Sequence, residues 1–221
     1  MKKVVQCLAA ILIFVVVFLA GAFIRLGIRT NNIHEDYSSI YINTKYNRPV
    51  YIEGIDVITQ KISCGYACIE MFSKWDGGDI TEETLFNEYG KVVTSNGPKF
   101  AEEMNKRFPG YTTTIHRYLT NIELIEAAYE TLSEGIPVPF EWAAKYGDDW
   151  TLHYSLLIGM DIQNDNITVA NPYGYIEEIS VEEFFERTSF EAYDNMPLYF
   201  KMAFAIDLFD KNTIFTVRKN N

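Results

Sequence analysis

The sequence predicts an α+β fold in which helices precede an antiparallel sheet. The first observation is helical periodicity at residues 64–75, where apolar side chains recur at every third or fourth position. The second is strand alternation at residues 152–159, followed by a polar turn at 161–166 and an extended segment at 167–170. The third is composition: 221 residues, 48% of them hydrophobic, suffice for one good core.

An apolar segment begins almost at the N-terminus. Lys2 and Lys3 precede residues 4–24, which contain no charged side chain. A helix needs about 20 apolar residues to span a bilayer, so we expect residues 4–24 to contact the membrane. The alternative is a cleavable signal peptide, with its cleavage site in the Ala-Gly-Ala of residues 20–22. The length of the run and Arg25 close behind it favour an uncleaved anchor.

Charge separates the N-terminus from the rest of the chain. Residues 1–30 carry four basic side chains and no acidic one, so the net charge of −11 for the chain leaves −15 for residues 31–221. Such a body repels phosphates, which excludes a nucleic acid as partner. We expect a single-pass cell-membrane protein with its body on the extracytoplasmic side, or a secreted protein if the segment is cleaved.

Three parts are expected along the chain: an anchor or signal segment at 1–30, a linker and edge segment at 31–50, and one domain at 51–221. His34 in the linker is interpreted as a solvated residue. Residues 51–58 alternate and predict a strand that enters the site.

The first half of the domain is expected to be mostly helical. The helix at 64–75 ends at an Asp-Gly-Gly sequence. Thr120 and Glu123 form a capping box for a later helix. Further helices are expected at residues 79–89, 96–108 and 120–135. Strand propensity appears at 111–115, and two prolines place the segment 136–140 at a sheet edge or the start of a strand.

The second half is expected to complete the sheet. In the strand at 152–159, His153 and Ser155 point away from the apolar face. Ser180 caps a last short helix that runs through Arg187. Closing strands are predicted at residues 199–207 and 213–217.

The cysteines indicate thiol chemistry rather than a disulfide framework. Cys7 lies in the apolar N-terminus, which leaves Cys64 and Cys68 in the body. Because an i,i+4 pair on one helix is poorly aimed for a disulfide, we expect free thiols. Cys68 lies on the apolar stripe of its helix and is interpreted as a core residue. Cys64 begins the helix, where partial positive charge favours a partly ionised, nucleophilic thiolate.

A nucleophilic cysteine needs a base within reach and a group that orients the base. His116 is interpreted as a surface residue. His153 stands on an otherwise apolar strand, where a satisfied core histidine is the alternative. A hairpin folded about residue 162 would set His153 opposite Asn171, whose side-chain amide is free because Pro172 ends the pairing.

Gln60 is the candidate for a second oxyanion donor, beside the backbone N–H of Cys64. The alternative is a glutamine of a surface loop. We expect no cofactor. Cys64, Cys68 and His153 would give zinc only three ligands, so no metal site is expected either.

Four pieces of the chain resemble the bacteriocin-processing (double-glycine leader type) cysteine peptidases and their free-standing bacterial relatives, in the papain-like superfamily. They are Gln60, the Cys-Gly-Tyr-Ala-Cys of 64–68, His153 with its strand, and the Asn-Pro-Tyr-Gly of 171–174. The resemblance covers about residues 50–205. It implies a papain-like α+β fold, with the catalytic helix packed on a C-terminal antiparallel sheet. It also implies that Cys64 is the nucleophile, His153 the general base and acid, and Asn171 the orienting residue.

Three positions depart from the family's usual pattern. Tyr66 stands where the family usually has a proline or another small residue, and Asn171 where it usually has Asp. Gln60 lies closer to Cys64 than the family's glutamine does, and Ile58 occupies the expected position.

The sequence therefore predicts an exported or membrane-anchored thiol peptidase that hydrolyses peptide bonds of peptide or protein substrates through Cys64, His153 and Asn171. One alternative keeps the chemistry but acts as a cell-wall peptide amidase or endopeptidase, or as a thiol acyltransferase. Another is a catalytically inactive, peptide-binding homologue. Leader-peptide processing is not expected, because the sequence has no transporter domain.

Overall fold

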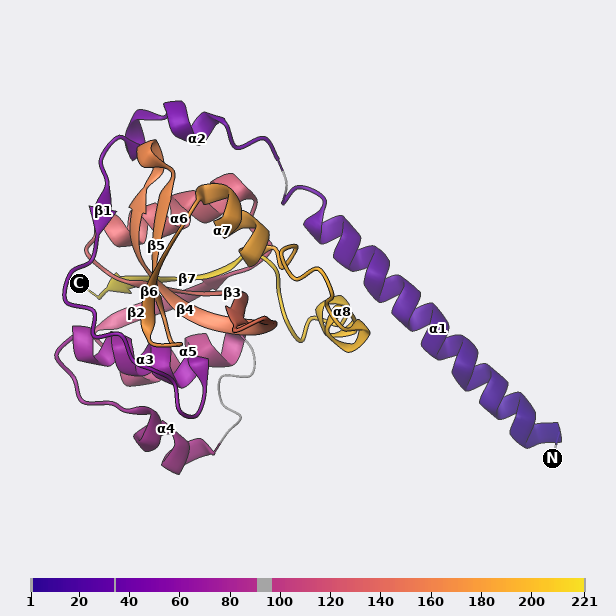
Figure 1. The fold of residues 1–221 in the computed structure, drawn as a ribbon. Coiled ribbons are helices and arrows are strands. Elements are labelled where there is room, and N and C mark those ends of the chain that lie inside the picture. Colours follow the sequence, from indigo (N-terminus) through magenta and orange to yellow (C-terminus); the bar gives the residue numbers. More distant parts are fainter. Residues whose placement is uncertain (1, 34, 91–96, 221) are drawn as a thin grey trace.

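An antiparallel sheet of seven strands lies at the centre of the domain (Figure 1). The structure is a computed structural model that describes residues 2–33, 35–90 and 97–220. The strands within those ranges are β1 (Val50–Tyr51), β2 (Tyr111–His116), β3 (Val138–Tyr146), β4 (Asp149–Asp161), β5 (Asn166–Asn171), β6 (Tyr175–Ile179) and β7 (Thr213–Lys219). Their order is β2-β7-β3-β4-β5-β6. Strand β1 pairs with Gly159 and Met160 of β4, just past the point where the first residue of β3, Val138, pairs with Leu157.

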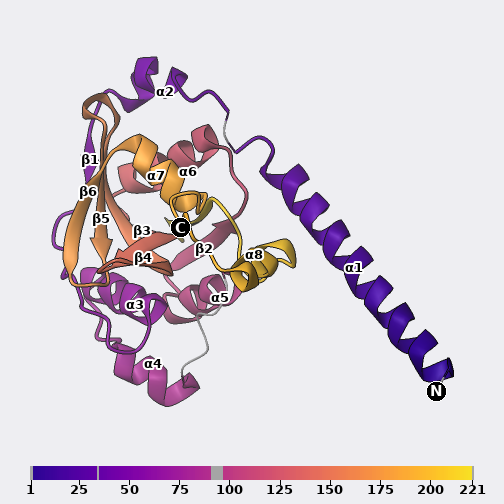
Figure 2. The same ribbon diagram turned by 45° about the vertical axis from the view of Figure 1, so that its right-hand side comes forward.

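The helices lie around this sheet. They are α1 (Lys2–Thr30), α2 (Ser39–Ile42), α3 (Cys64–Trp75), α4 (Glu82–Tyr89), α5 (Gly97–Arg107), α6 (Asn121–Ser133), α7 (Val181–Thr188) and α8 (Leu198–Ala205), with single 3₁₀ turns at Thr44–Tyr46 and Ile162–Asn164. Figure 2 shows α3 and α5 on one side of the sheet and α6 and α7 on the other. The prediction of an α+β fold, with helices before the sheet, is confirmed.

Several helices begin where their capping residues predict. Helix α3 has its predicted bounds, and the Ser63 hydroxyl accepts the N–H of Tyr66. The capping box of Thr120 and Glu123 is complete at the start of α6. In α7 the Ser180 hydroxyl accepts the N–H of Glu183. The predicted start of the third helix, Asn96, lies outside the described residues.

Two strand predictions are wrong. Residues 199–207 form α8 and the turn after it, because β7 already occupies the sheet position between β2 and β3. Ala203 and Phe204 of α8 pack beside the sheet instead, with Phe204 against Phe190 at a ring-centroid distance of 4.9 Å. The strand predicted at 51–58 ends at Tyr51, and the backbone then turns at Gly54, which has a φ of 78°.

The segment 136–140 begins β3, as its prolines allow, but β3 is an interior strand. The first two residues of β3, Val138 and Pro139, pair only with β4, and pairing with β7 is found at Phe140 and Glu141. Pro139 therefore occupies a stretch of β3 where no N–H is needed for the β7 ladder. Strand β6 was not predicted at all.

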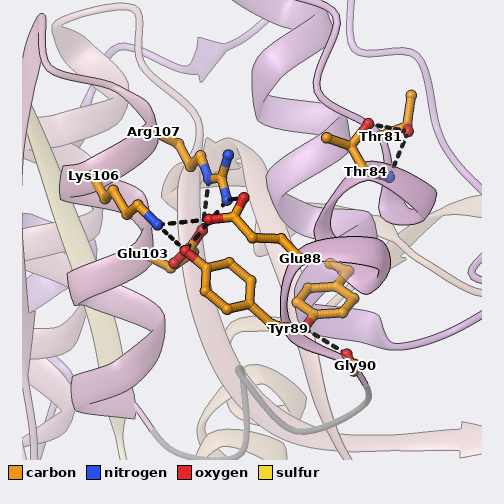
Figure 3. A network of polar contacts seen from close by, with 9 residues as sticks. Thr81, Thr84, Glu88, Tyr89, Gly90, Glu103, Lys106 and Arg107 are labelled. Atoms are coloured by element: carbon orange, nitrogen blue, oxygen red, sulfur yellow. Dashed lines mark hydrogen bonds and ion pairs between the residues drawn. The ribbon is translucent and has the colours of Figure 1, made fainter.

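Helices α4 and α5 are joined by a network of ion pairs (Figure 3). The Glu88 carboxylate pairs with Lys106 at 2.8 Å and also with Arg107. Arg107 in turn binds Glu103 at 2.6 Å, and the Tyr89 hydroxyl accepts from Lys106. Because Glu88 and Lys106 are exposed, we assign these pairs a role in docking α4 rather than a large share of stability.

Helix α1 extends away from the domain, and its C-terminal part lies beside α8 (Figures 1 and 2). Within the described residues it is the one helix long and apolar enough to cross a membrane. Arg25 and Arg29 each contact the carboxylate of Asp207, which follows α8, at 2.7 Å. Helix α1 is therefore bound to the body directly, as well as through the covalent chain.

Candidate active site

Cys64 is the first residue of α3, and the loop before it is held by one carboxylate. Both oxygens of Glu82 accept backbone N–H groups of this loop, from Lys61 at 2.8 Å, Ile62 at 3.2 Å and Ser63 at 3.0 Å. Glu82 is buried, and its own N–H donates to Glu70 at 2.8 Å. The sequence predicted Glu82 only as part of a helix start, so its role in holding the Cys64 loop was missed.

The Cys64 thiol is less acidic than the sequence suggested. Burial raises the pKa of Cys64 to about 11, although N–H groups of Tyr154, Gly65 and Cys64 itself act to lower it. Desolvation of the charged form therefore outweighs the effect of the helix N-terminus. The expectation of a partly ionised thiolate is wrong for this conformation, in which Cys64 is a neutral thiol.

Cys64 and His153 line one cavity of about 570 Å³. We call it the Cys64–His153 cavity. Its walls are largely aromatic, with Trp150, Phe190, Tyr193, Tyr199, Phe200 and Phe209. Glu141 contributes the one carboxyl group among the lining residues. Burial raises the pKa of Glu141 to about 8, and the Tyr154 hydroxyl donates to this carboxyl at 2.6 Å.

His153 lies buried on β4 and is held from two directions. Its Nε2 is 3.1 Å from Oδ1 of Asn171, and its ring stacks on Tyr173 with centroids 4.2 Å apart. Burial lowers the pKa of His153 to about 3, so the ring is neutral. Since Nε2 donates to an oxygen, Nδ1 carries the lone pair and is the nitrogen that can act as a base.

The orientation of the Asn171 amide follows from its other contacts. Oδ1 also accepts the N–H of Tyr173 at 3.0 Å, whereas Nδ2 donates to the Glu177 carboxylate at 2.9 Å. A flipped amide would set an NH₂ group against an N–H donor and an oxygen against a carboxylate. Oδ1 therefore faces His153, and this assigns the proton to Nε2.

An ion pair between a buried cation and a half-buried carboxylate stands behind Asn171. Glu177 on β6 accepts from Arg187 of α7 at 2.6 Å. The Arg187 guanidinium lies 3.7 Å from the centre of the Trp142 ring and donates from Nε to the carbonyl of Ala143 at 2.9 Å. Neither Glu177 nor Arg187 was singled out from the sequence, because β6 was not predicted and Arg187 appeared only as the end of a helix.

The hairpin that joins His153 to Asn171 has a different register from the predicted one. Leu156 pairs with Ala170, and the register shifts between Leu157 and Gly159. Asn171 therefore lies diagonally from His153 rather than opposite it. Diagonal neighbours on one face of a sheet lie within reach of long side chains, so the contact forms despite the wrong register.

Gln60 lies beside this hairpin. Its N–H donates to the carbonyl of Pro172 at 2.7 Å, and Thr59 bridges to Tyr173. Its Oε1 is buried with no hydrogen-bond partner in the described part of the chain. Gln60 lines a second cavity of about 370 Å³, which shares Thr151 with the Cys64–His153 cavity. The structure thus places Gln60 near the site but not among the residues that line a cavity with Cys64.

The remaining candidates lie away from this cavity. Cys68 is fully buried, and it and Cys64 are free thiols. Tyr66 is also buried, and its hydroxyl donates to the carbonyl of Gly90 at 2.9 Å rather than filling the site. His116 on β2 is half-buried and binds Thr216. His34 lies outside the described residues. Within the described ranges, no group of three or more His, Cys, Asp or Glu side chains could hold a metal ion.

Comparisons with known proteins place these observations in context. Residues 52–197 match the model of the Peptidase C39 like family. Among solved structures, the chain is similar to a double glycine motif protease from an AMS/PCAT transporter in complex with the leader peptide. The two share 16% identity with a TM-score of 0.49, over 78% of this chain and 99% of that one. None of the curated proteins matches the chain.

Proposed function

Because the chain belongs to the Peptidase C39 like family, we propose that it is a thiol peptidase in which Cys64, His153 and Asn171 form the triad. The observation that carries this proposal is the arrangement of the three side chains. A thiol and an imidazole line one cavity, and the far nitrogen of that imidazole is bound by an amide whose orientation is fixed. This arrangement supports the roles of nucleophile, base and orienting group for the three residues.

In the proposed reaction, thiol and imidazole begin neutral. As the sulfur of Cys64 attacks the substrate carbonyl, its proton passes to Nδ1 of His153 and a tetrahedral oxyanion forms. The imidazolium then gives this proton to the leaving amine, and the C–N bond breaks to leave a thioester. Water, deprotonated by the same Nδ1, hydrolyses the thioester and restores the thiol.

The groups behind His153 suit the charge that develops on it. The imidazolium keeps its Nε2–H on Asn171, and Glu177 on the other side of the amide adds negative charge to that side. Arg187 balances Glu177 in the resting state. For the oxyanion we propose the backbone N–H of Cys64, at the N-terminus of α3, and Gln60 remains the candidate for a second donor.

We further propose that α1 is an uncleaved anchor with the body outside, followed by the linker at 31–50 and the peptidase domain at 51–221. Retention of the segment is supported by its length and flanking charge. Residues 4–24 carry no charged side chain over about the length that spans a bilayer, and Arg25 follows at once.

An electrophilic peptide tests the proposal. The full chain, reconstituted in detergent, is treated with a peptidyl vinyl sulfone and the modified residue is located by mass spectrometry. We expect modification at Cys64, lost in Cys64→Ala, retained in Cys68→Ala and strongly reduced in His153→Ala. Modification at Cys68 alone, or none at all, would overturn the proposal. Peptidoglycan stem peptides and protein substrates, assayed in parallel, separate peptidase action from cell-wall hydrolysis.

A further inference from the structure

The contact between α1 and α8 fixes where α8 lies relative to a membrane. Phe23 and Leu26 of α1 share a small cavity with Lys201 and Phe204 of α8. Leu26 is half-buried, whereas most other residues of α1 are exposed. Helix α8 therefore lies beside the C-terminal end of the apolar segment, and Asp207 after α8 contacts Arg25 and Arg29 just beyond that end.

The length of the apolar segment sets the depth of this contact. Residues 4–24 carry no charge. At about 1.5 Å per residue, such a helix is about as long as the hydrocarbon layer of a bilayer is thick, roughly 30 Å. The entire segment is thus needed to span the membrane, and Phe23 must lie at the outer edge of the hydrocarbon. Because Lys201 and Phe204 of α8 line the same cavity as Phe23, α8 lies at about the same depth.

The outward face of α8 and the turn after it suits that position. Four large apolar side chains are exposed there: Leu198 at 68%, Tyr199 at 65%, Ile206 at 41% and Leu208 at 52%. They lie within eleven residues of the chain, and no described segment covers them. Tyrosine and aliphatic side chains of this kind are enriched where a protein meets the boundary between headgroups and acyl chains.

The negative charge of Asp207, beside this apolar face, is compensated by neighbouring side chains. Asp207 is the one carboxylate in residues 197–209. It binds Arg25 and Arg29 at 2.7 Å each and accepts from the Tyr118 hydroxyl at 3.2 Å. A carboxylate with two cations and a hydroxyl can lie near a bilayer at a much lower cost than a free one.

We propose that residues 197–209 lie in the outer interface of the bilayer that α1 spans, so that the Cys64–His153 cavity opens at the membrane surface and takes membrane-bound polypeptides as substrates. The occupant of the exposed face is the lipid bilayer. The link to the cavity is direct, because Tyr199, Phe200 and Phe209 of this segment form part of its wall. The choice of substrate rests on the proposed peptidase function, whereas the bilayer contact does not.

Fluorescence quenching tests the bilayer contact without any assay of activity. The full chain is reconstituted in phosphatidylcholine–phosphatidylglycerol vesicles with or without lipids brominated on their acyl chains. The variants Leu198→Trp and Leu208→Trp place a probe on the proposed lipid face, and Ile42→Trp is a control on α2, where Ile42 is 84% exposed. We expect brominated lipid to quench the added fluorescence at residues 198 and 208 at least about twofold more than at residue 42. Equal quenching at the three positions would overturn the proposal.

Cleavage of one peptide in two forms tests the substrate class. The peptide is presented either free or tethered to the vesicles by a membrane helix. The double variant Leu198→Glu/Leu208→Glu adds charge to the proposed lipid face without touching the cavity lining, and Ile42→Glu/Ile176→Glu is the matched control. We expect the double variant to lose about tenfold in cleavage of the tethered peptide, with the free peptide unaffected, because interfacial charge weakens the membrane contact.

Equal loss on both forms, or no loss on either, would overturn the substrate assignment. If the unmodified chain cleaves neither form and Cys64 resists the electrophilic peptide, the proposed peptidase function has failed. The quenching result then still decides whether α8 contacts the bilayer.

Discussion

The two halves of the candidate site are each held by a carboxylate, but the two negative charges are compensated in different ways. On the nucleophile side, Glu82 accepts three consecutive backbone N–H groups before Cys64. On the base side, Glu177 accepts from the Asn171 amide and forms an ion pair with Arg187. Peptide dipoles from a loop compensate the first carboxylate, and a side chain from a distant helix compensates the second. The first half should therefore depend on local chain geometry, and the second on tertiary packing.

The largest effect is expected from removing the cation. Arg187→Met leaves Glu177 without its ion-pair partner. Breaking a fully buried pair typically costs about 3–5 kcal/mol of stability, and we expect the lower end of this range because Glu177 is half-buried. The free energy of unfolding, from urea titration, measures this loss. The double variant Arg187→Met/Glu177→Gln removes both charges and should recover a large part of it. If the double variant is no more stable than Arg187→Met, the coupling between the two residues is absent.

The next effect tests the nucleophile side. Glu82→Gln keeps the shape of the side chain but turns an NH₂ group towards backbone donors, which should cost about 2–3 kcal/mol. Chemical denaturation gives the change in stability, and labelling of Cys64 by the peptidyl vinyl sulfone reports on the loop. Glu83→Gln, one residue along the same helix turn and exposed, is the matched control. Equal stability of the two variants would contradict the role of Glu82.

A third carboxyl group, Glu141, has neither three N–H partners nor a close cation. Burial raises its pKa to about 8, and Asp210 acts in the same direction, whereas the Tyr154 hydrogen bond and Arg117 oppose it. The folded state therefore holds a proton that the unfolded state releases near pH 4.5. Stability from this group is present at low pH and is lost as the pH rises through about 8.

Glu141→Gln should remove this pH dependence and still accept the Tyr154 hydroxyl. Relative to Glu141→Gln, the original chain should lose on the order of 3–4 kcal/mol between pH 5 and pH 8, since one unit of pKa corresponds to about 1.4 kcal/mol. Unfolding of both proteins at each pH measures the difference. The lowered pKa of His153 also makes stability depend on pH: its contribution is present above about pH 6.5 and is lost as the pH falls towards 3. Because both proteins contain His153, this contribution cancels when the two are compared. Parallel curves for the two proteins would contradict the prediction.

The smallest effect isolates the charge behind the base. Glu177→Gln keeps a hydrogen-bond acceptor for Asn171 but removes the negative charge that favours imidazolium, so kcat/KM should fall about tenfold. If Glu177 has only a structural role, the pH dependence of kcat/KM will be unchanged. If its charge matters, the variant should shift the part of the pH profile in which His153 titrates. Glu178→Gln, exposed on the same strand, is the control. An unchanged pH profile would assign Glu177 to folding alone.

The features that could be predicted from the sequence are those that depend on local chain geometry, and those that depend on tertiary packing were missed. Helix α3 was predicted with its correct bounds, because its cap and its apolar period are local. The pairing of His153 with Asn171 was also reached, since two strands joined by a short turn must lie side by side. The register was not, because the prediction centred the turn on residue 162, whereas Asp161 pairs with Asn166, and the bulge between Leu157 and Gly159 shifts the ladder by only one residue.

The features that were missed depend on contacts between distant parts of the chain. Strand β6 is short and mostly exposed, so its apolar pattern is weak, and with it Glu177 was missed. Helix α8 was predicted as a strand because a run of aromatic and aliphatic residues fits either element. The ionisation of Cys64 was misjudged because burial by the surrounding fold cannot be seen in a helix N-terminus alone.

The two arginine contacts to Asp207 also limit how far the domain can move relative to α1. A domain on a flexible linker would sample many heights above a membrane, set by the length of the linker. Here α1 is fastened to the body at α8, so residues 31–50 connect the two without setting the distance between them. Under the proposed anchoring and substrate class, the distance of a peptide bond from the bilayer determines where cleavage occurs, before any side chain is selected.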